Sequence, residues 1–220
     1  MVKNIANQIV MSGKKIAIII AHPDDETLWA GGTLLDHPEW DTYIFCLCRK
    51  YDTDRAPKFK KALDIFNSEG AMEDLDDGPA QTPQELNHVS DLILKALPSY
   101  TWDIIITHSP SGEYSRHLRH EEIGKAVMNL WLADKLHSNE LLTFAYEDGN
   151  RMYFPQAIKQ ANLYFNLSTK YWKQKYNIIT EIYGFEPGSW EAKTTPKEEA
   201  FWRFTAKETA IAWLKRNSLL

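Results

Sequence analysis

A short run of unbroken apolar residues near the N-terminus constrains the fold of this chain most. Residues 15–21 read KIAIIIA, with polar residues on both sides. A run this short and this rich in isoleucine predicts a β-strand that is buried on both faces. A second run of the same kind, WDIIIT, covers residues 102–107. Strands buried on both faces need helices above and below them, so the sequence predicts an α/β fold.

The rest of the chain alternates between strand and helix patterns. Further strands are predicted over residues 41–48, 71–75 and 140–146, and helices over residues 27–35, 57–68, 82–97, 120–136, 170–183 and 197–214. This alternation predicts a Rossmann-like, mostly parallel sheet with helices on both faces. We expect one domain over residues 1–220, with a flexible N-terminus over 1–13 and a helical C-terminal part over 150–220.

Composition narrows the functional class and the compartment. The 220 residues carry a net charge of −5, which disfavours a nucleic-acid partner because such proteins present a basic surface. The apolar run is far too short to cross a bilayer, so no membrane span is expected. Cys46 and Cys48 are the two cysteines, and near neighbours are poor disulfide partners. Two reduced, buried thiols suit the cytoplasm, which is the location we expect.

Residues suited to metal chemistry directly follow the two apolar strands. The first strand runs into His22-Pro23-Asp24-Asp25-Glu26, and the second is followed by a loop that contains His117 and His120. In a parallel sheet, the carboxyl ends of the strands meet at one edge, where ligands bind. Two histidines and a carboxylate can fill three positions of a tetrahedral zinc ion and leave the fourth for water. The sequence therefore favours a metal site at this edge.

These segments resemble the signatures of the LmbE-like, or PIG-L-type, zinc deacetylases. Residues 21–26 read AHPDDE and residues 31–34 read GGTL, as in the first family signature. The second signature, H-x-x-H at the start of a helix, stands here as HLRH over residues 117–120, whereas its common form is HPDH. The resemblance covers residues 14–150. It implies a Rossmann-like sheet and hydrolysis of an N-acetyl group, usually from a sugar of the N-acetylglucosamine type.

The resemblance also implies roles for individual residues of the two signatures. By position, His22, Asp25 and His120 are the expected zinc ligands. Asp24 is the expected general base. His117 is the expected general acid or the partner of the oxyanion.

Other residues are expected around the substrate. Arg55 resembles a family arginine that contacts substrate, Asp77 resembles the aspartate of a D-G turn that touches sugar hydroxyls, and Tyr114 is expected to line the pocket. His108 is interpreted either as a residue that orients a ligand or as a structural histidine. Trp190 is the candidate for a lid over the site.

The arginines Arg116 and Arg119 flank His117. They are interpreted either as binding an anionic group of the substrate or as solvated loop residues.

Three rival functions share these residues. Two histidines and a carboxylate also form the facial triad of iron(II) oxygenases, so Fe²⁺ or another divalent metal is an alternative to Zn²⁺. A non-catalytic module that binds sugar or metal is a second rival, and a hydrolase of a different amide is a third. The expected partner is a small N-acylated sugar or conjugate, and a homo-oligomer is left open.

Overall fold

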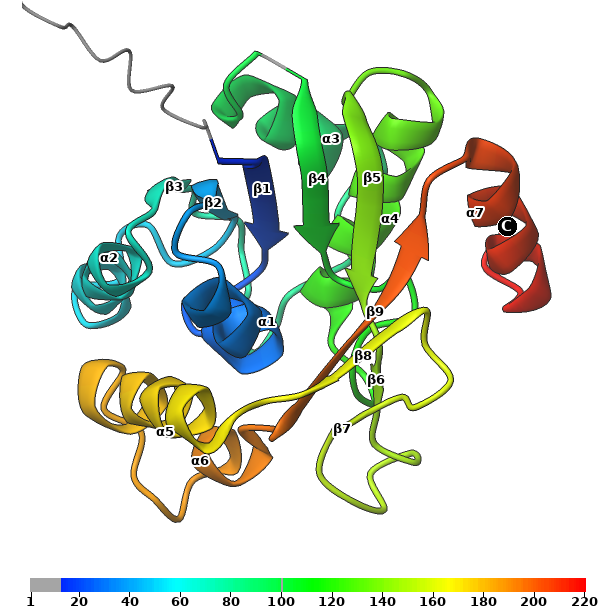
Figure 1. Cartoon of the computed structure of the whole chain (residues 1–220). Helices are drawn as coiled ribbons and strands as arrows, with labels where there is room; N and C mark the ends of the chain where they lie inside the picture. The colour runs from blue at the N-terminus through cyan, green and yellow to red at the C-terminus, as the bar shows by residue number, and fades with distance from the viewer. Residues whose placement is uncertain (1–12, 100) are drawn as a thin grey trace, which may run out of the picture.

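A seven-stranded sheet forms the centre of the computed structural model, which describes residues 13–99 and 101–220 (Figure 1). Its strand order is β3-β2-β1-β4-β5-β9-β8, with a separate two-stranded ribbon of β6 and β7. The strands are β1 Lys15–Ile20, β2 Asp41–Cys46, β3 Glu69–Met72, β4 Trp102–Thr107, β5 Ser138–Phe144, β6 Tyr146–Glu147, β7 Gln156–Ala157, β8 Leu163–Asn166 and β9 Glu198–Phe204. The helices are α1 Asp25–Asp36, α2 Arg55–Phe66, α3 Leu86–Ala96, α4 Leu118–Leu132, α5 Thr169–Asn177, the π-helix η1 Ile178–Ile182, α6 Trp190–Thr194 and α7 Lys207–Arg216. The predicted α/β fold is confirmed, and the prediction for residues 1–12 lies outside the described residues.

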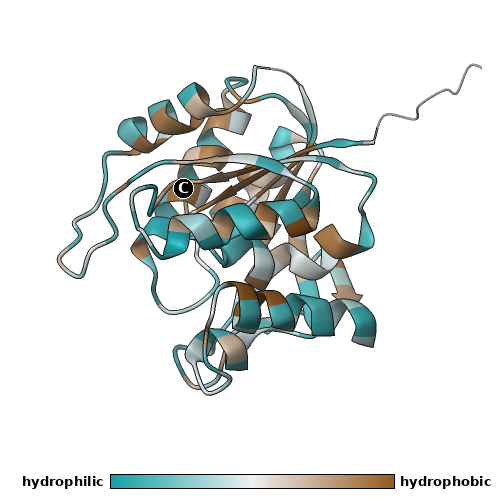
Figure 2. Cartoon of the chain, turned by 90° about the vertical axis from the view of Figure 1, so that its left-hand side faces the viewer, coloured by the Kyte–Doolittle hydropathy of each residue, from teal (hydrophilic) through white to brown (hydrophobic). Residues whose placement is uncertain are grey.

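Both faces of the sheet are buried, as the unbroken isoleucine run predicts. On β1, Ile16 and Ile18 pack into one apolar cluster, whereas Ala17 and Ile19 pack into another. The first cluster is completed by α1, α2 and η1, and the second by α3, α4 and α7. Figure 2 shows the apolar strands between helices whose solvent-facing sides are largely hydrophilic. The sheet is therefore a middle layer between two layers of helices.

The order of the parallel strands creates a binding edge. β1 lies between β2 and β4, and β1 to β5 all run parallel. The chain moves outward from β1 in one direction through β2 and β3, and then in the other through β4 and β5. Where a strand order reverses in this way, the loops on the carboxyl side separate and leave a crevice. The loops after β1 and β4, which carry the predicted metal-binding residues, meet at this crevice.

The prediction of a helical C-terminal part over 150–220 is wrong where the chain forms the strands β7, β8 and β9. Residues 197–214 were expected to be one helix, but Glu198–Phe204 form β9 and the helix α7 covers Lys207–Arg216. β9 pairs antiparallel with β5 on one side and with β8 on the other. Glu and Ala favour a helix locally, but the ladder bonds to β5 and burial of Phe201 outweigh that preference. The helix expected over 170–183 is present as α5 and η1.

The predicted start of α3 is also wrong. Thr82 and Pro83 were expected to begin the helix, which instead begins at Leu86. The carbonyl oxygen of Thr82 accepts a hydrogen bond from Arg119 at 3.0 Å, and the amide of Gln84 donates to a Glu122 carboxylate oxygen at 2.8 Å. These bonds to α4 hold the segment outside the helix.

Two smaller expectations concern the cysteines and the membrane. Cys46 and Cys48 are buried free thiols, as expected. Across the described residues, no helix has both the length and the apolar character that a membrane crossing requires.

Candidate active site

The turn between β1 and α1 holds Asp24 in a strained backbone conformation. Its φ is 119°, in the left-handed region that favours glycine. The carbonyl oxygen of Asp24 accepts hydrogen bonds from the amides of Thr27 at 3.0 Å and Leu28 at 2.8 Å. The amide of Asp24 donates to a carboxylate oxygen of Glu26, which is fully buried. A conformation of this kind costs about 1–3 kcal/mol and concentrates at functional sites.

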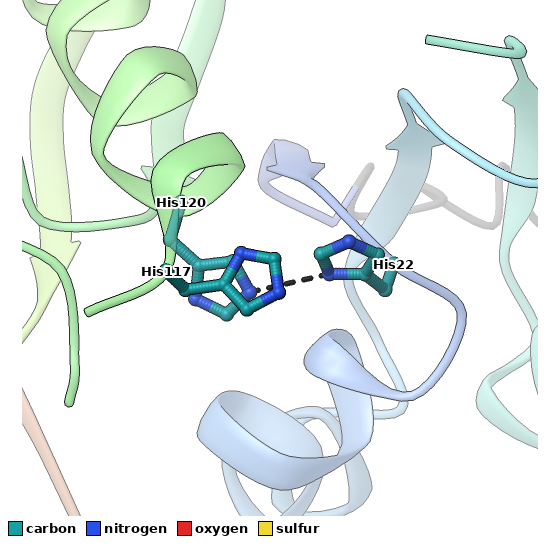
Figure 3. Close-up of side chains that lie close together, drawn as sticks. All are labelled: His22, His117 and His120. Carbon is teal, nitrogen blue, oxygen red and sulfur yellow. Dashed lines mark hydrogen bonds between the residues drawn. The ribbon is translucent and has the colours of Figure 1, made fainter. Parts of the chain in front are cut away.

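Three of the predicted residues, the trio His22, Asp25 and His120, converge beside this turn. His22 Nδ1 lies 3.2 Å from His120 Nε2 and 3.3 Å from Asp25 Oδ2, and the last two atoms are 3.4 Å apart. Figure 3 shows His22 facing His120 and His117 across the crevice. Donors placed 2.0–2.1 Å from a tetrahedral zinc ion lie about 3.3 Å from one another. The donor types and their spacing therefore fit one divalent cation.

Both oxygens of the Asp25 carboxylate accept hydrogen bonds that fix its orientation. Oδ2 accepts from the amide of His22 at 2.8 Å, and Oδ1 accepts from the Trp29 ring nitrogen at 3.0 Å. Burial opposes its charge, but His120 and His108 hold the pKa of this carboxyl well below its usual range. Asp25 is therefore an oriented carboxylate.

Glu113 orients His120 and is the main residue that the sequence analysis did not single out. Its Oε2 lies 2.7 Å from His120 Nδ1 and 2.9 Å from His108 Nδ1, and its Oε1 accepts from the amide of Ser109 at 2.8 Å. Although burial opposes its charge, His108 and His120 lower the pKa of Glu113 to about 2. A proton on His120 Nδ1 leaves Nε2 free to face the site. The sequence feature that could have identified Glu113 is its place as an acidic residue between β4 and the H-x-x-H pair.

His108 connects Glu113 and His120 to the end of β1. Its Nε2 accepts a hydrogen bond from the amide of Ala21 at 3.0 Å and lies 3.3 Å from Asp25 Oδ2. The side chain is fully buried. This geometry favours the interpretation of His108 as an orienting residue.

Asp24 projects into the site beside the trio without joining it. Its Oδ2 accepts from Arg55 Nη1 at 3.1 Å, and Arg55 also lies over the ring of Phe185. Burial and the neighbouring Asp25 raise the pKa of Asp24, while Arg55 opposes that rise. Arg55, expected at the substrate, thus reaches the cavity while bonded to Asp24.

Asp77 lies on the opposite side of His22. Its Oδ2 is 3.3 Å from His22 Nε2 and accepts from Arg49 Nε at 2.8 Å. Arg119 fixes this loop from α4, because it donates to the carbonyl oxygens of Asp76 and Thr82. Arg119 is completely buried, so it is neither a solvated residue nor an accessible anion site.

Arg116 has a different environment from Arg119. Its side chain is 76% exposed and pairs with Glu121. This position agrees with the interpretation of a solvated loop residue.

A cavity of about 210 Å³ opens over these residues. His117 lines it, and burial with the nearby His120 and His22 lowers its pKa to about 3. Its Nδ1 is buried without a hydrogen-bond partner among the described residues. Tyr114 and Trp190 close the far side, with ring centroids 4.9 Å apart. The lining residues are His22, Pro23, Asp24, Asp25, Leu28, Trp29, Arg49, Arg55, Asp77, Tyr114, His117, Trp190 and Glu191.

Comparison with known families gives a match over the part of the chain that carries this site. The family model described as PIG-L, GlcNAc-PI de-N-acetylase, matches residues 17–131. The matched region begins in β1 and ends in α4, and it contains all the residues of the trio.

Individual relatives are more distant. Uncharacterized protein L374 of Acanthamoeba polyphaga mimivirus is 22% identical over 176 residues, which are 74% of this chain and 75% of that protein. Among solved structures, N,N'-diacetylchitobiose deacetylase from Pyrococcus horikoshii is similar at a TM-score of 0.64 and 15% identity, covering 87% of this chain and 84% of that one. The 4-carboxy-2-hydroxymuconate hydratase GalB from Pseudomonas putida is similar at a TM-score of 0.59 and 15% identity, covering 88% of this chain and 97% of that one. At these identities the structures share the fold alone.

Proposed function

The chain belongs to the PIG-L, or GlcNAc-PI de-N-acetylase, family, and on this premise we propose that it is a metal-dependent hydrolase that removes the acyl group from an N-acylated amino sugar. Family membership supports a deacetylase. One observation carries the proposal for this chain: three donors of a candidate cation site lie within 3.4 Å of one another, and two of them, His22 and Asp25, line the same cavity as the separate carboxylate of Asp24. A metal-dependent hydrolase of an unactivated amide uses both parts, a cation that activates water and a base that takes its proton.

His22 Nδ1, Asp25 Oδ2 and His120 Nε2 are the proposed metal ligands. Three protein ligands are typical of a catalytic zinc site. A zinc ion bound there would act as a Lewis acid and would lower the pKa of a bound water molecule to about 7. Glu113 and Asp25 are both ionised next to the histidines, so the protein supplies the negative charge that a divalent cation requires.

Asp24 is the proposed general base. Asp24 lies beside the trio, and its Oδ2 is held by the hydrogen bond from Arg55. Its other carboxylate oxygen is therefore available to take a proton from the attacking water. As the carbonyl carbon becomes tetrahedral, its oxygen gains negative charge. A neutral His117 can donate an N–H to that oxygen. The proton held by Asp24 then passes to the amine as the carbon–nitrogen bond breaks.

The cavity wall suits a hydroxylated substrate. Arg49, Arg55 and Asp77 line it with charged groups, whereas Tyr114 and Trp190 offer aromatic faces. Aromatic rings and a few polar groups are the usual combination at sites for small polar molecules. We propose that Arg55, Asp77 and Tyr114 contact the sugar.

The fold by itself does not choose this reaction. The similarity to the hydratase GalB illustrates that one fold carries different chemistries, so the proposal must rest on the site. An iron(II) oxygenase would use the same trio, and a binding module would not need a carboxylate such as that of Asp24, held beside the trio on a strained backbone. The reaction assay separates these possibilities.

The decisive experiment measures amine release from N-acetylglucosamine and its conjugates. We expect release with zinc-loaded protein, loss after treatment with a chelator, and recovery when zinc is added back. Metal analysis after anaerobic purification and an oxygen-uptake assay test the iron alternative. Oxygen uptake with iron, together with no amine release from any N-acyl sugar, would contradict the proposal.

A further inference from the structure

A second cavity, of about 620 Å³, lies directly beside the first. Tyr114 and Trp190 line both cavities, and their rings meet edge to face with centroids 4.9 Å apart. One layer of aromatic side chains therefore separates the two spaces. In Figure 1 the β6–β7 hairpin, whose connecting loop lines this second cavity, lies beyond the carboxyl ends of β4 and β5.

Apolar side chains that are exposed to solvent form the wall of the second cavity. Met152 is 80% exposed, Phe154 is 43% exposed and Trp190 is 38% exposed. Pro155 and Tyr153 complete this side of the groove. Large apolar side chains that gather at a groove mark a binding site, because exposing them together costs free energy.

The loop that carries these side chains is held in place. The Asp148 carboxylate accepts from both the amide and the hydroxyl of Ser115, each at 2.8 Å. The carbonyl oxygen of Asp148 accepts from the amides of Met152 at 3.0 Å and Tyr153 at 3.2 Å. Ser115 directly follows Tyr114, so the loop is tied to the segment that lines the first cavity. A wall fixed in advance loses little conformational entropy when a ligand binds.

The polar residues of the groove favour an apolar occupant over a second sugar. Arg151 donates to the carbonyl oxygen of Ser115, whose hydroxyl bonds to Asp148. Arg151 Nε, the Ser115 hydroxyl and the Asp148 carboxylate are therefore bonded within this loop, and the exposed side chains of Met152 and Phe154 beside them carry no hydrogen-bonding group. A ligand rich in hydroxyl groups would lose hydrogen bonds to water with little replacement, whereas an alkyl or aryl group loses none.

We propose that this groove is a subsite for an alkyl or aryl group that is attached directly to the amino sugar. The inference rests on the proposed function, because it assumes that the sugar occupies the first cavity. The apolar group comes from one of two sources, the aglycone or the N-acyl chain. Since only one layer of rings separates the cavities, no long linker between the sugar and the apolar group is required.

The test compares matched substrates. The aglycone arm uses the hexyl and methyl glycosides of N-acetylglucosamine, and the acyl arm uses N-hexanoyl- and N-acetylglucosamine. We expect kcat/KM to be about tenfold or more higher for the longer member of one pair, because burial of methylene groups is favourable. The pair that shows the preference identifies the source.

The double variant Met152→Ser/Phe154→Ser should bring that ratio close to one. Ile65→Ser is the matched control, because Ile65 is 44% exposed and lies near the end of α2, about 15 Å along the helix from Arg55. The control should keep the wild-type ratio. Equal rates within both substrate pairs, or an unchanged preference in the double variant, would overturn the proposal.

A binding measurement separates this inference from the proposed function. Calorimetry with hexyl and methyl β-glucoside, which carry no amide, reports the subsite without turnover. Tighter binding of the hexyl compound that disappears in the double variant supports the subsite even if no N-acyl sugar is hydrolysed. If both glucosides bind equally, and N-hexanoyl- and N-acetylglucosamine are hydrolysed at equal rates, the subsite is wrong and the hydrolase stands.

Discussion

At the scale of single residues, the site consists of charged groups that lie a few ångströms apart but make different interactions. Asp25 is fixed between the two histidines of the trio and Trp29, whereas the adjacent Asp24 has a strained backbone and bonds to Arg55. Two neighbouring carboxylates thus have different surroundings. This difference underlies the proposal that one binds metal and the other moves a proton.

Asp24→Asn should keep the metal and lose turnover. The amide has nearly the shape of the carboxylate but cannot accept the proton of water, and general-base catalysis contributes about 10²–10⁴-fold. We expect kcat to fall within that range while zinc content, measured by elemental analysis, stays stoichiometric. Near-normal turnover by this variant would rule out the base assignment.

Glu113→Gln should weaken metal binding although Glu113 is not a proposed ligand. It removes the charge that orients His120, and loss of such supporting groups typically costs 10–100-fold in metal affinity. Competition with a chelating dye measures the affinity. The control is Glu140→Gln, a carboxylate on β5 that pairs with Arg203 away from the site. Equal affinities of the two variants would contradict the orienting role.

At the scale of elements, α1 is locked to the C-terminal part of the chain by a buried carboxylate. Glu199 on β9 accepts from the amides of Gly32 and Thr33, both at 2.7 Å, and from Lys175 Nζ at 2.7 Å. Lys175 and Glu199 are both fully buried. A Cβ at Gly32 would lie 2.3 Å from the side chain of Leu167, so a larger residue there would require that side chain to move. β9 therefore fixes the helix that follows the turn after β1.

Glu199→Ala should destabilise the whole protein. Removing one partner leaves a buried ammonium group and two amides without their acceptor, and breaking a buried pair costs about 3–5 kcal/mol. Denaturant unfolding measures the loss. Glu140→Ala, which removes a partly exposed ion pair, should cost about 1 kcal/mol or less. Similar losses for both variants would refute the locking role.

At the scale of the molecule, the proposed metal links two distant parts of the chain. His22 and Asp25 come from the β1–α1 turn, and His120 comes from α4, ninety-eight positions from His22. The cation would bind the folded chain and not the unfolded one. Metal binding should therefore stabilise the fold as a whole.

Zinc should raise the Tm of the wild-type protein. Free zinc at 100 times its Kd adds about 2.7 kcal/mol to the free energy of unfolding. Thermal unfolding with zinc and with chelator measures the difference. Asp24→Asn should keep the shift, and His120→Ala should lose it together with bound metal. Stoichiometric zinc in His120→Ala would count against the proposed ligand set.

The sequence alone determined the parallel part of the sheet, β1 to β5, and the meeting of the two loops. Ile16–Ile20 and the second apolar run specify strands by their local pattern, and parallel strands must bring their carboxyl ends to one edge. The resemblance of residues 21–26 and 117–120 to the two family signatures then singled out His22, Asp25 and His120. The structure brings these three residues together, while their role as ligands stays a proposal.

Only the tertiary structure decided which long-range bonds override local preference. Residues 198–204 form a strand because β5 offers them a partner, and Thr82 stays outside α3 because Arg119 binds its carbonyl oxygen. The orienting role of Glu113 likewise depends on two histidines folding against it. Local patterns report hydrophobic periodicity and turn chemistry, but a hydrogen bond between distant residues leaves no periodic trace in the sequence.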